Sequence, residues 1–397
     1  MSDSGLPAPM RVLNTIGRLA PADRIDRFRL DEATVRDEAM HRVGMRDFGD
    51  QSFIEGLDAL LGSIGTDMEP HLVGQIALRQ AIVDALVNRL LLTHERRHRP
   101  HLFQAPLRAP IIVTGLHRSG TTHLHRLLAQ DVDSHAPPYW QLIAPIVPPG
   151  SVDNRRERAR RSLAVRTAMM PDLSRMHSIG ADTPEECFYL TASSFQSVFF
   201  WSMAPVTGYL QWYLRSDRTQ KYREYRAWLQ ILQAQAPGKR LVLKAPEHLG
   251  ALEALLGAVP EAEVVHIHRD PVTAYASYLS MAKTTQSLTV ADLDVHRTAE
   301  TSLDLFASEL RALARARATH GDRIHDVDYT DVVADPVGAV TAIYRSLSMP
   351  MSAQFTSALR SYAASEPKDR HGVHHYRLAD EGVDEDWVRR RLCSPSA

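Results

Sequence analysis

Two amphipathic patterns mark the first hundred residues of the chain. Residues 73–97 place apolar side chains at three- and four-residue spacing and end in basic residues, as a helix C-terminus prefers. Residues 47–65 carry a second, shorter pattern of the same kind. We therefore expect residues 1–105 to form a helical N-terminal extension, and residues 106–397 to form a separate domain.

Short runs rich in β-branched residues begin after this helical part. Helical patterns separate them, and the first run leads directly into the helical segment THLHRLLAQD. Strand–helix alternation predicts a parallel sheet with helices on both faces, because each crossover helix packs back onto the sheet. The predicted strands are IIVTG (111–115), LVLK (241–244), VVHIH (264–268) and IHDVDY (324–329). Residues 150–240 are mostly helical in pattern. The fold class is therefore α/β, with a helical insertion and the helical extension.

Composition and charge exclude several classes of protein. The 397 residues are 44% hydrophobic and 23% charged, which is ordinary for a globular protein. With 46 basic and 47 acidic residues the net charge is -1, so neither nucleic acid nor an acidic membrane is expected as a bulk partner. Two cysteines predict no disulfide framework, and no leader or membrane-spanning run is apparent. We expect a soluble cytoplasmic protein, and the oligomeric state is not readable.

The stretch GLHRSGTT, from Gly115 to Thr122, has the spacing of a phosphate-binding loop but lacks its lysine, because Thr121 stands at that position. Glycines between a strand and a helix let backbone N–H groups turn toward an anion at the helix N-terminus. The two threonines add hydroxyl donors, and Arg118 supplies a positive charge. The plainer interpretation is a tight turn with a capping threonine. The flanking strand and helix and the arginine favour an anion site.

A second candidate anion site lies in HIHRDPVTAYASYLS, residues 266–280. Arg269 follows a predicted buried strand, at the edge where open α/β sheets bind ligands. Pro271 suits a first helical turn, and Ser277 lies on that helix. An arginine fork and a hydroxyl can hold one phosphate. The alternative is a capping Asp270 beside a solvated arginine.

Both segments resemble those of sulfotransferases that use 3′-phosphoadenosine 5′-phosphosulfate, in particular bacterial members with a helical N-terminal extension. GLHRSGTT is similar to the loop that holds the 5′-phosphosulfate, although His117 stands where proline is usual. Residues 266–280 resemble the 3′-phosphate motif, and DRHGVHHY (369–376) loosely resembles the loop that closes over this phosphate. The resemblance implies a P-loop-type core and these donor-binding residues: His117, Arg118, Ser119, Gly120, Thr121, Thr122, Arg269, Ser277, Arg370 and Gly372.

Sulfuryl transfer needs a cation for the leaving phosphate and a base for the acceptor proton. LVLKAPEH resembles the family segment with lysine and histidine after a strand, which implies Lys244 as the cation and His248 as the base. The alternatives are that Lys244 pairs with Glu247 at the surface and that His248 merely occupies the next helical turn. The reaction implies no metal, since side-chain cations and backbone amides can stabilise the charge.

Other acid–base candidates come from the helical insertion. Thr183 and Glu186 have capping-box spacing around Pro184, so we interpret Glu186 as structural. Glu185 and His177 are left as candidates to face the acceptor. Some relatives have a glutamate base in the region where this chain has Gln141, and an amide cannot serve as a base.

Several further features have a plainer interpretation. His266 and His268 share one face of a strand, but no third metal ligand is evident from the sequence. The basic run at 155–161 suggests a solvated helix face or a lid. The aromatic residues Phe199, Phe200, Trp201, Trp212 and Tyr213 suggest either core or the wall of an apolar acceptor pocket.

We therefore predict a sulfotransferase acting on a hydroxyl or amine of a small, apolar acceptor. One alternative is a nucleoside or small-molecule kinase of the same architecture, which would want a lysine in the loop and an acidic metal ligand. The other is a nucleotide-binding protein without catalysis. Lys244 and His248 weigh against the latter.

Overall fold

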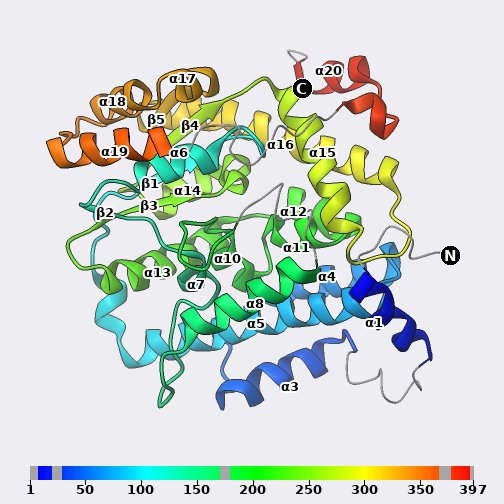
Figure 1. The fold of residues 1–397 in the computed structure, drawn as a ribbon. Coiled ribbons are helices and arrows are strands. Elements are labelled where there is room, and N and C mark those ends of the chain that lie inside the picture. The colour runs from blue at the N-terminus through cyan, green and yellow to red at the C-terminus, as the bar shows by residue number, and fades with distance from the viewer. Residues whose placement is uncertain (1–7, 20–28, 170–178, 366–376, 394–397) are drawn as a thin grey trace.

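A five-stranded parallel sheet lies in the upper left part of the molecule in Figure 1, and the computed structural model describes residues 8–19, 29–169, 179–365 and 377–393. The strand order is β2-β3-β1-β4-β5. The strands are β1 (Ile111–Thr114), β2 (Ser134–His135), β3 (Arg240–Lys244), β4 (Glu263–His268) and β5 (Ile324–Asp328). The predicted strands coincide with β1, β3, β4 and β5. The two-residue β2 is too short to give a pattern in the sequence.

Helices account for most of the remaining described chain. Before β1 they are α1 (Ala8–Leu19), α3 (Glu32–Val43), α4 (Phe53–Asp67), α5 (Leu72–His98) and the 3₁₀ turn η1 (Pro100–Gln104). Between β1 and β3 they are α6 (Thr121–Leu128), α7 (Tyr139–Ile143), α8 (Arg155–Met169), α10 (Phe188–Thr191), η2 (Ala192–Ser194), α11 (Val198–Met203), α12 (Thr207–Arg215) and α13 (Thr219–Gln235). After β3 they are η3 (Pro246–Ala251), α14 (Leu252–Ala258), α15 (Pro271–Gln286), α16 (Val295–His320), η4 (Gly321–Arg323), α17 (Tyr329–Ala334), α18 (Pro336–Ser346), α19 (Ala353–Ser365), η5 (Leu378–Glu381) and α20 (Glu385–Cys393).

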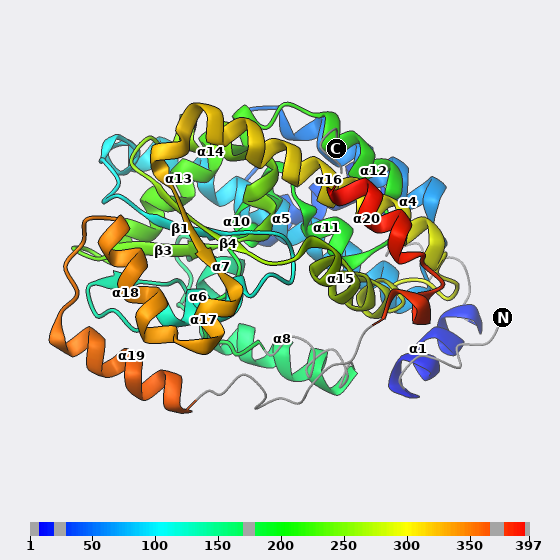
Figure 2. The same cartoon turned by 90° about the horizontal axis from the view of Figure 1, so that it is seen from above.

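The two faces of the sheet pack against different helices. Ile112 and Val264 belong to a core shared with α13, α14, α15 and α16. Their chain neighbours Val113 and Val265 belong to a second core with α6, α17, α18 and α19. Successive strand side chains point to opposite faces, so the two cores lie on opposite sides of the sheet (Figure 2). The predicted fold class, a P-loop-type parallel sheet flanked by helices, is confirmed.

The helices before β1 share a hydrophobic core with residues that lie after β1. Phe53 and Leu57 of α4 and Leu86 of α5 share a third core with Phe200 and Tyr209, which lie between β1 and β3. The pattern over residues 73–97 corresponds to α5, and the pattern over 47–65 to α4 and the loop before it. The division of the chain at residue 105 stays a prediction.

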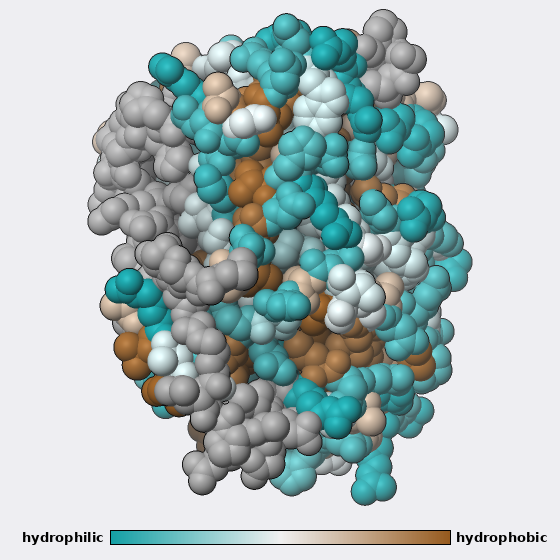
Figure 3. Space-filling model, turned by 90° about the vertical axis from the view of Figure 1, so that its right-hand side faces the viewer, coloured by the Kyte–Doolittle hydropathy of each residue, from teal (hydrophilic) through white to brown (hydrophobic). Residues whose placement is uncertain are grey.

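The surface on the side of α1 is a mosaic of polar side chains with apolar patches between them (Figure 3). Val12 and Ile16 of α1 and Ile76 of α5 are among the large apolar side chains that are exposed. Within the residues described, no helix is long and apolar enough to cross a bilayer.

Candidate active site

The loop between β1 and α6 has the backbone shape of an anion cradle. Arg118 and Gly120 adopt left-handed φ angles of 69° and 96°. A Cβ on Gly120 would lie 2.6 Å from the ring of Tyr329, so only glycine fits there. The hydroxyl of Ser119 is fully buried and has no hydrogen-bond partner among the described residues. The loop therefore offers a buried donor and the free first turn of α6 to a bound anion.

The two predicted anion motifs meet across 159 residues of sequence. Arg118 Nε donates to the Ser277 hydroxyl of α15 over 3.1 Å. The Arg269 guanidinium donates to the Arg118 carbonyl over 2.5 Å and lies 4.5 Å from the centre of the Tyr329 ring. Asp270 caps α15 by accepting from the backbone N–H of Thr273 at 2.8 Å. Asp270 thus caps the helix as the alternative expected, but Arg269 is held against the loop and is not freely solvated.

Lys244, the last residue of β3, is fully buried beside the loop. Its ammonium group lies 3.1 Å from the hydroxyl of Thr122 and 2.7 Å from a carboxylate oxygen of Glu186. The alternative that Lys244 pairs with Glu247 at the surface is wrong. Glu247 is itself buried and pairs with Lys221 at 3.1 Å. A buried cation of the neighbouring strand therefore lies beside the loop.

The two adjacent glutamates are placed in the reverse of the expected order. Glu185 is buried, with its Oε1 3.8 Å from Lys244 Nζ and accepting from the Glu186 backbone N–H at 3.0 Å. Glu186 holds Lys244 more closely and its side chain is 17% exposed. The capping box is also wrong, because the next helix starts only at Phe188 and the Thr183 hydroxyl bonds to Gly180. Of the two glutamates, Glu186 is thus both closer to Lys244 and the one that solvent reaches.

His248 is fully buried beside the rings of Tyr222 and Tyr225. Its Nδ1 is 3.0 Å from the Tyr222 hydroxyl and its Nε2 is 3.2 Å from the Cys187 sulfur. Burial lowers the pKa of His248 to about 3, so this imidazole is neutral at pH 7 and a weak base. Burial also raises the pKa of Cys187 to about 12, which makes this thiol unreactive. The role of His248 as the base stays a prediction, and this enclosed geometry does not favour it.

The side chain of His117 contacts residues of α15 and α16. Its Nε2 is 3.5 Å from Glu309 of α16, and its ring lies 5.0 Å from that of Tyr278. Burial pushes the pKa of His117 downward, but the Glu309 carboxylate outweighs burial and holds the pKa above its ordinary value. The loop thus carries an imidazole whose protonated form is favoured by a buried carboxylate. Glu309 was missed because a single acid inside a long amphipathic helix has no local signature.

Only part of the aromatic stretch is fully buried in the core. Phe200, Trp201 and Tyr213 are buried in the hydrophobic core, as one interpretation expected. Phe199 is only partly buried, and its ring centre is 5.4 Å from those of both Phe188 and Tyr189. Phe188 and Tyr189 follow Glu186 closely in sequence, so this aromatic trio adjoins the carboxylates beside Lys244.

Of the other candidate residues, some bond to neighbouring side chains and others lie outside the described residues. Gln141 bonds to His135 at 2.8 Å and to Gln235 at 2.7 Å. The basic run lies in α8, where Arg160 pairs with Asp182 at 2.8 Å and is exposed. His177, Arg370 and Gly372 lie outside the described residues.

Comparison with known proteins gives consistent matches. A family model described as the sulfotransferase family matches residues 110–353. Two curated proteins, the omega-hydroxy-beta-dihydromenaquinone-9 sulfotransferases Stf3 of Mycobacterium tuberculosis and Mycobacterium bovis, are 26% identical over 302 residues, covering 70% of this chain and 73% of each relative. The crystal structure of sulfotransferase STF1 from Mycobacterium tuberculosis H37Rv matches with a TM-score of 0.79 and 30% identity, over 91% of this chain and 98% of that one. STF9 from Mycobacterium avium matches with a TM-score of 0.80 and 26% identity, over 92% and 95% of the two chains.

Proposed function

The chain belongs to the sulfotransferase family, and we propose that it moves a sulfuryl group from 3′-phosphoadenosine 5′-phosphosulfate to the hydroxyl of a small apolar acceptor. The observation that carries this proposal is the contact between Lys244 and Thr122. A phosphate loop without its own lysine receives a buried ammonium group from β3, 3.1 Å from a loop hydroxyl. This arrangement fits a phosphosulfate better than a triphosphate, whose γ-phosphate needs the loop lysine.

In the proposed complex, the loop of residues 115–122 holds the 5′-phosphosulfate with its backbone N–H groups, the Ser119 hydroxyl and the two threonines. Arg269 and the Arg118–Ser277 pair bind the 3′-phosphate. The buried Ser119 hydroxyl and the left-handed loop backbone support this fit. Arg370 and Gly372 remain further candidates for the 3′-phosphate on the resemblance alone.

The transfer itself breaks the bond from sulfur to the leaving phosphate oxygen and forms a bond from sulfur to the acceptor oxygen. Charge develops on the departing adenosine bisphosphate, and Lys244 is the group that we propose to stabilise it. No oxidant or reductant is consumed, and the acceptor proton must leave. We propose that the residues already named suffice for this step without a metal ion.

For the acceptor proton we propose Glu186 in place of His248. Glu186 is partly exposed and 2.7 Å from the Lys244 ammonium group, which itself contacts the loop. His248, by contrast, is enclosed by Tyr222 and Cys187. Since a general base must reach the acceptor proton directly or through one water, the partly exposed carboxylate is better placed. His177 and Glu185 stay alternatives, the first on sequence alone.

The acceptor is proposed to be an apolar alcohol. The partly exposed aromatic trio of Phe188, Tyr189 and Phe199 adjoins the carboxylates and supplies an apolar surface for it. The name of the Stf3 relatives points to a hydroxylated menaquinone derivative as their acceptor. Because those proteins are 26% identical to this chain, we carry over the class of acceptor and not the molecule.

The test is transfer of label from a ³⁵S-labelled sulfate donor to a panel of acceptors. We expect sulfation of hydroxylated isoprenoid quinones or other apolar alcohols, and none of glycans. The Lys244→Met variant, with its fold checked by circular dichroism, should lose turnover by about 10²–10³-fold, as expected when a group that stabilises transition-state charge is lost. Sulfation of charged glycans alone would reject the acceptor class. Phosphate transfer from adenosine triphosphate in place of sulfate transfer would reject the activity.

A further inference from the structure

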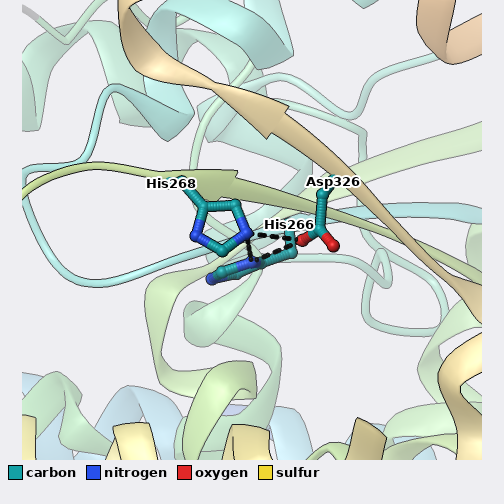
Figure 4. A group of neighbouring side chains, drawn as sticks. All are labelled: His266, His268 and Asp326. Carbon is teal, nitrogen blue, oxygen red and sulfur yellow. Dashed lines mark hydrogen bonds and ion pairs between the residues drawn. The ribbon is translucent and has the colours of Figure 1, made fainter.

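Two histidines and an aspartate converge near the carboxyl end of β4 (Figure 4). His266 and His268 lie two residues apart on β4, and Asp326 is the residue of β5 directly opposite His266. Alternate residues of a strand share a face, so both imidazoles point to the side of the sheet that α16 covers. Pairing of β4 with β5 supplies the third donor that the sequence did not reveal, 58 residues after His268.

The donor atoms form a tight triangle. The separations are 3.2 Å from His266 Nδ1 to His268 Nε2, 3.0 Å from His266 Nδ1 to Asp326 Oδ1 and 2.7 Å from His268 Nε2 to Asp326 Oδ1. Ligands at zinc bond lengths of about 2.0–2.2 Å in a tetrahedron are roughly 3.3 Å apart. The triangle therefore needs only a small expansion to hold such an ion.

The charge of the cluster is balanced in the structure by Arg317 of α16. Its guanidinium donates to Asp326 Oδ2 over 2.8 Å, and its Nη2 lies 3.2 Å from His266 Nδ1 and 3.3 Å from His268 Nε2. The nitrogen atoms of a guanidinium group can only donate hydrogen bonds. Arg317 can therefore donate to Asp326, but it can donate to a histidine only if the imidazole nitrogen that faces it carries a lone pair. Arg317 Nη2 also donates to Asp326 Oδ1 over 2.5 Å, so if both imidazoles donate to the same atom, three N–H donors crowd one oxygen. A cation at this corner would use both imidazole lone pairs and the carboxylate together.

We propose that His266, His268 and Asp326 form a binding site for a late first-row divalent cation, with Zn²⁺ as the best fit. Imidazole and carboxylate donors in this number suit zinc and disfavour Mg²⁺, which prefers oxygen ligands in octahedral geometry. The side chains of His268 and Asp326 are 46% and 41% exposed, so an ion can enter from solvent. Arg317, 33% exposed, would swing aside and could keep its contact to the outer carboxylate oxygen.

The cation would tie β4 to β5 directly before Arg269, and it takes no part in the transfer. The bound cation is therefore detected by the number of ions that each chain binds and by the stability of the fold. An ion that binds only the folded chain raises the melting temperature in proportion to the logarithm of its free concentration.

The test is equilibrium dialysis of the full-length chain against Zn²⁺ alone, after treatment with chelator and desalting. We expect one Zn²⁺ per chain, with affinity reduced at least tenfold in His268→Ala and in Asp326→Asn. His325→Ala is the matched control, because His325 lies on the same strand as Asp326 but pairs with Glu263 at 2.9 Å. It should bind Zn²⁺ like the wild type. A melting curve without metal shows for each variant whether the fold is retained.

Arg317→Ala provides an independent arm, because it removes the competing guanidinium without touching a proposed ligand. We expect it to bind Zn²⁺ more tightly than the wild type. Equal binding by the wild type and His268→Ala would overturn the proposal. Stoichiometric binding by Arg317→Ala alone would show that the guanidinium excludes the ion, and would overturn the proposal for the native protein.

Discussion

Arg118 and Ser277 are joined by a hydrogen bond of 3.1 Å from the guanidinium Nε to the hydroxyl. This bond connects the loop after β1 with helix α15, and Arg269 reinforces it by donating to the Arg118 carbonyl. The two anion motifs are therefore one continuous surface at the carboxyl ends of β1 and β4. A ligand with phosphate groups at both its 5′ and 3′ positions would contact both motifs at once.

The Arg269→Ala variant should bind adenosine 3′,5′-bisphosphate less tightly. Loss of one charge-assisted contact costs about 1.5–3 kcal/mol, which is roughly a ten- to hundredfold loss of affinity. Isothermal calorimetry measures it. Arg311→Ala is the control, because Arg311 is an exposed arginine on α16. Unchanged affinity in Arg269→Ala would remove this residue from the donor site.

Glu186→Gln should reduce turnover by about 10²–10⁴-fold, because the amide keeps the shape of the side chain but cannot accept the acceptor proton. Donor affinity should stay within a few-fold of the wild type, which separates a base from a residue that only holds the nucleotide. His248→Gln is the comparison, and we expect it to affect stability more than turnover. If His248→Gln loses turnover and Glu186→Gln keeps it, the base is the histidine.

Adenosine 3′,5′-bisphosphate should stabilise the chain with or without magnesium. At about 100 times its dissociation constant a ligand adds roughly 2.7 kcal/mol, a shift of a few degrees in melting temperature. Adenosine triphosphate should stabilise it much less, because its 3′-hydroxyl leaves Arg269 without a phosphate. A thermal-shift comparison of the two ligands, each with magnesium and with chelator, decides between them. Stronger, magnesium-dependent stabilisation by the triphosphate would favour a kinase.

Folding stability should fall between pH 7 and pH 5 because of buried neutral histidines. Burial lowers the pKa of both His125 and His248 to about 3. Each of these histidines binds a proton near pH 6.5 in the unfolded chain but not in the folded chain. Each therefore leaves the free energy of unfolding unchanged above about pH 7 and lowers it progressively below pH 6.5.

At pH 5 the cost is roughly 2 kcal/mol for each of these histidines. The His248→Gln variant lacks one of them and should lose about 2 kcal/mol less than the wild type over the same interval. Denaturant unfolding at the two pH values measures the difference. Equal losses in both proteins would show that His248 is not held neutral by the fold.

The sequence alone determined those features that depend on neighbours in the chain. The strand β1, the loop glycines and the start of α6 follow one another within a few residues, so periodicity and spacing predict them together. Arg269, Pro271 and the capping Asp270 are predicted for the same reason. The division of the chain at residue 105, the cytoplasmic location and the roles of His177, Arg370 and Gly372 stay predictions.

Only the tertiary structure decided how distant residues meet. Glu186 faces Lys244 while Glu185 is buried, an orientation that two adjacent acids do not reveal in sequence. His248 has the residue type of a base, but the packing of Tyr222 of α13 and of Cys187 around it lowers its pKa. Asp326 comes beside His268 only because β4 and β5 pair in one register. Contact, burial and charge at these positions are set by the packing of segments far apart in the chain, which no local pattern encodes.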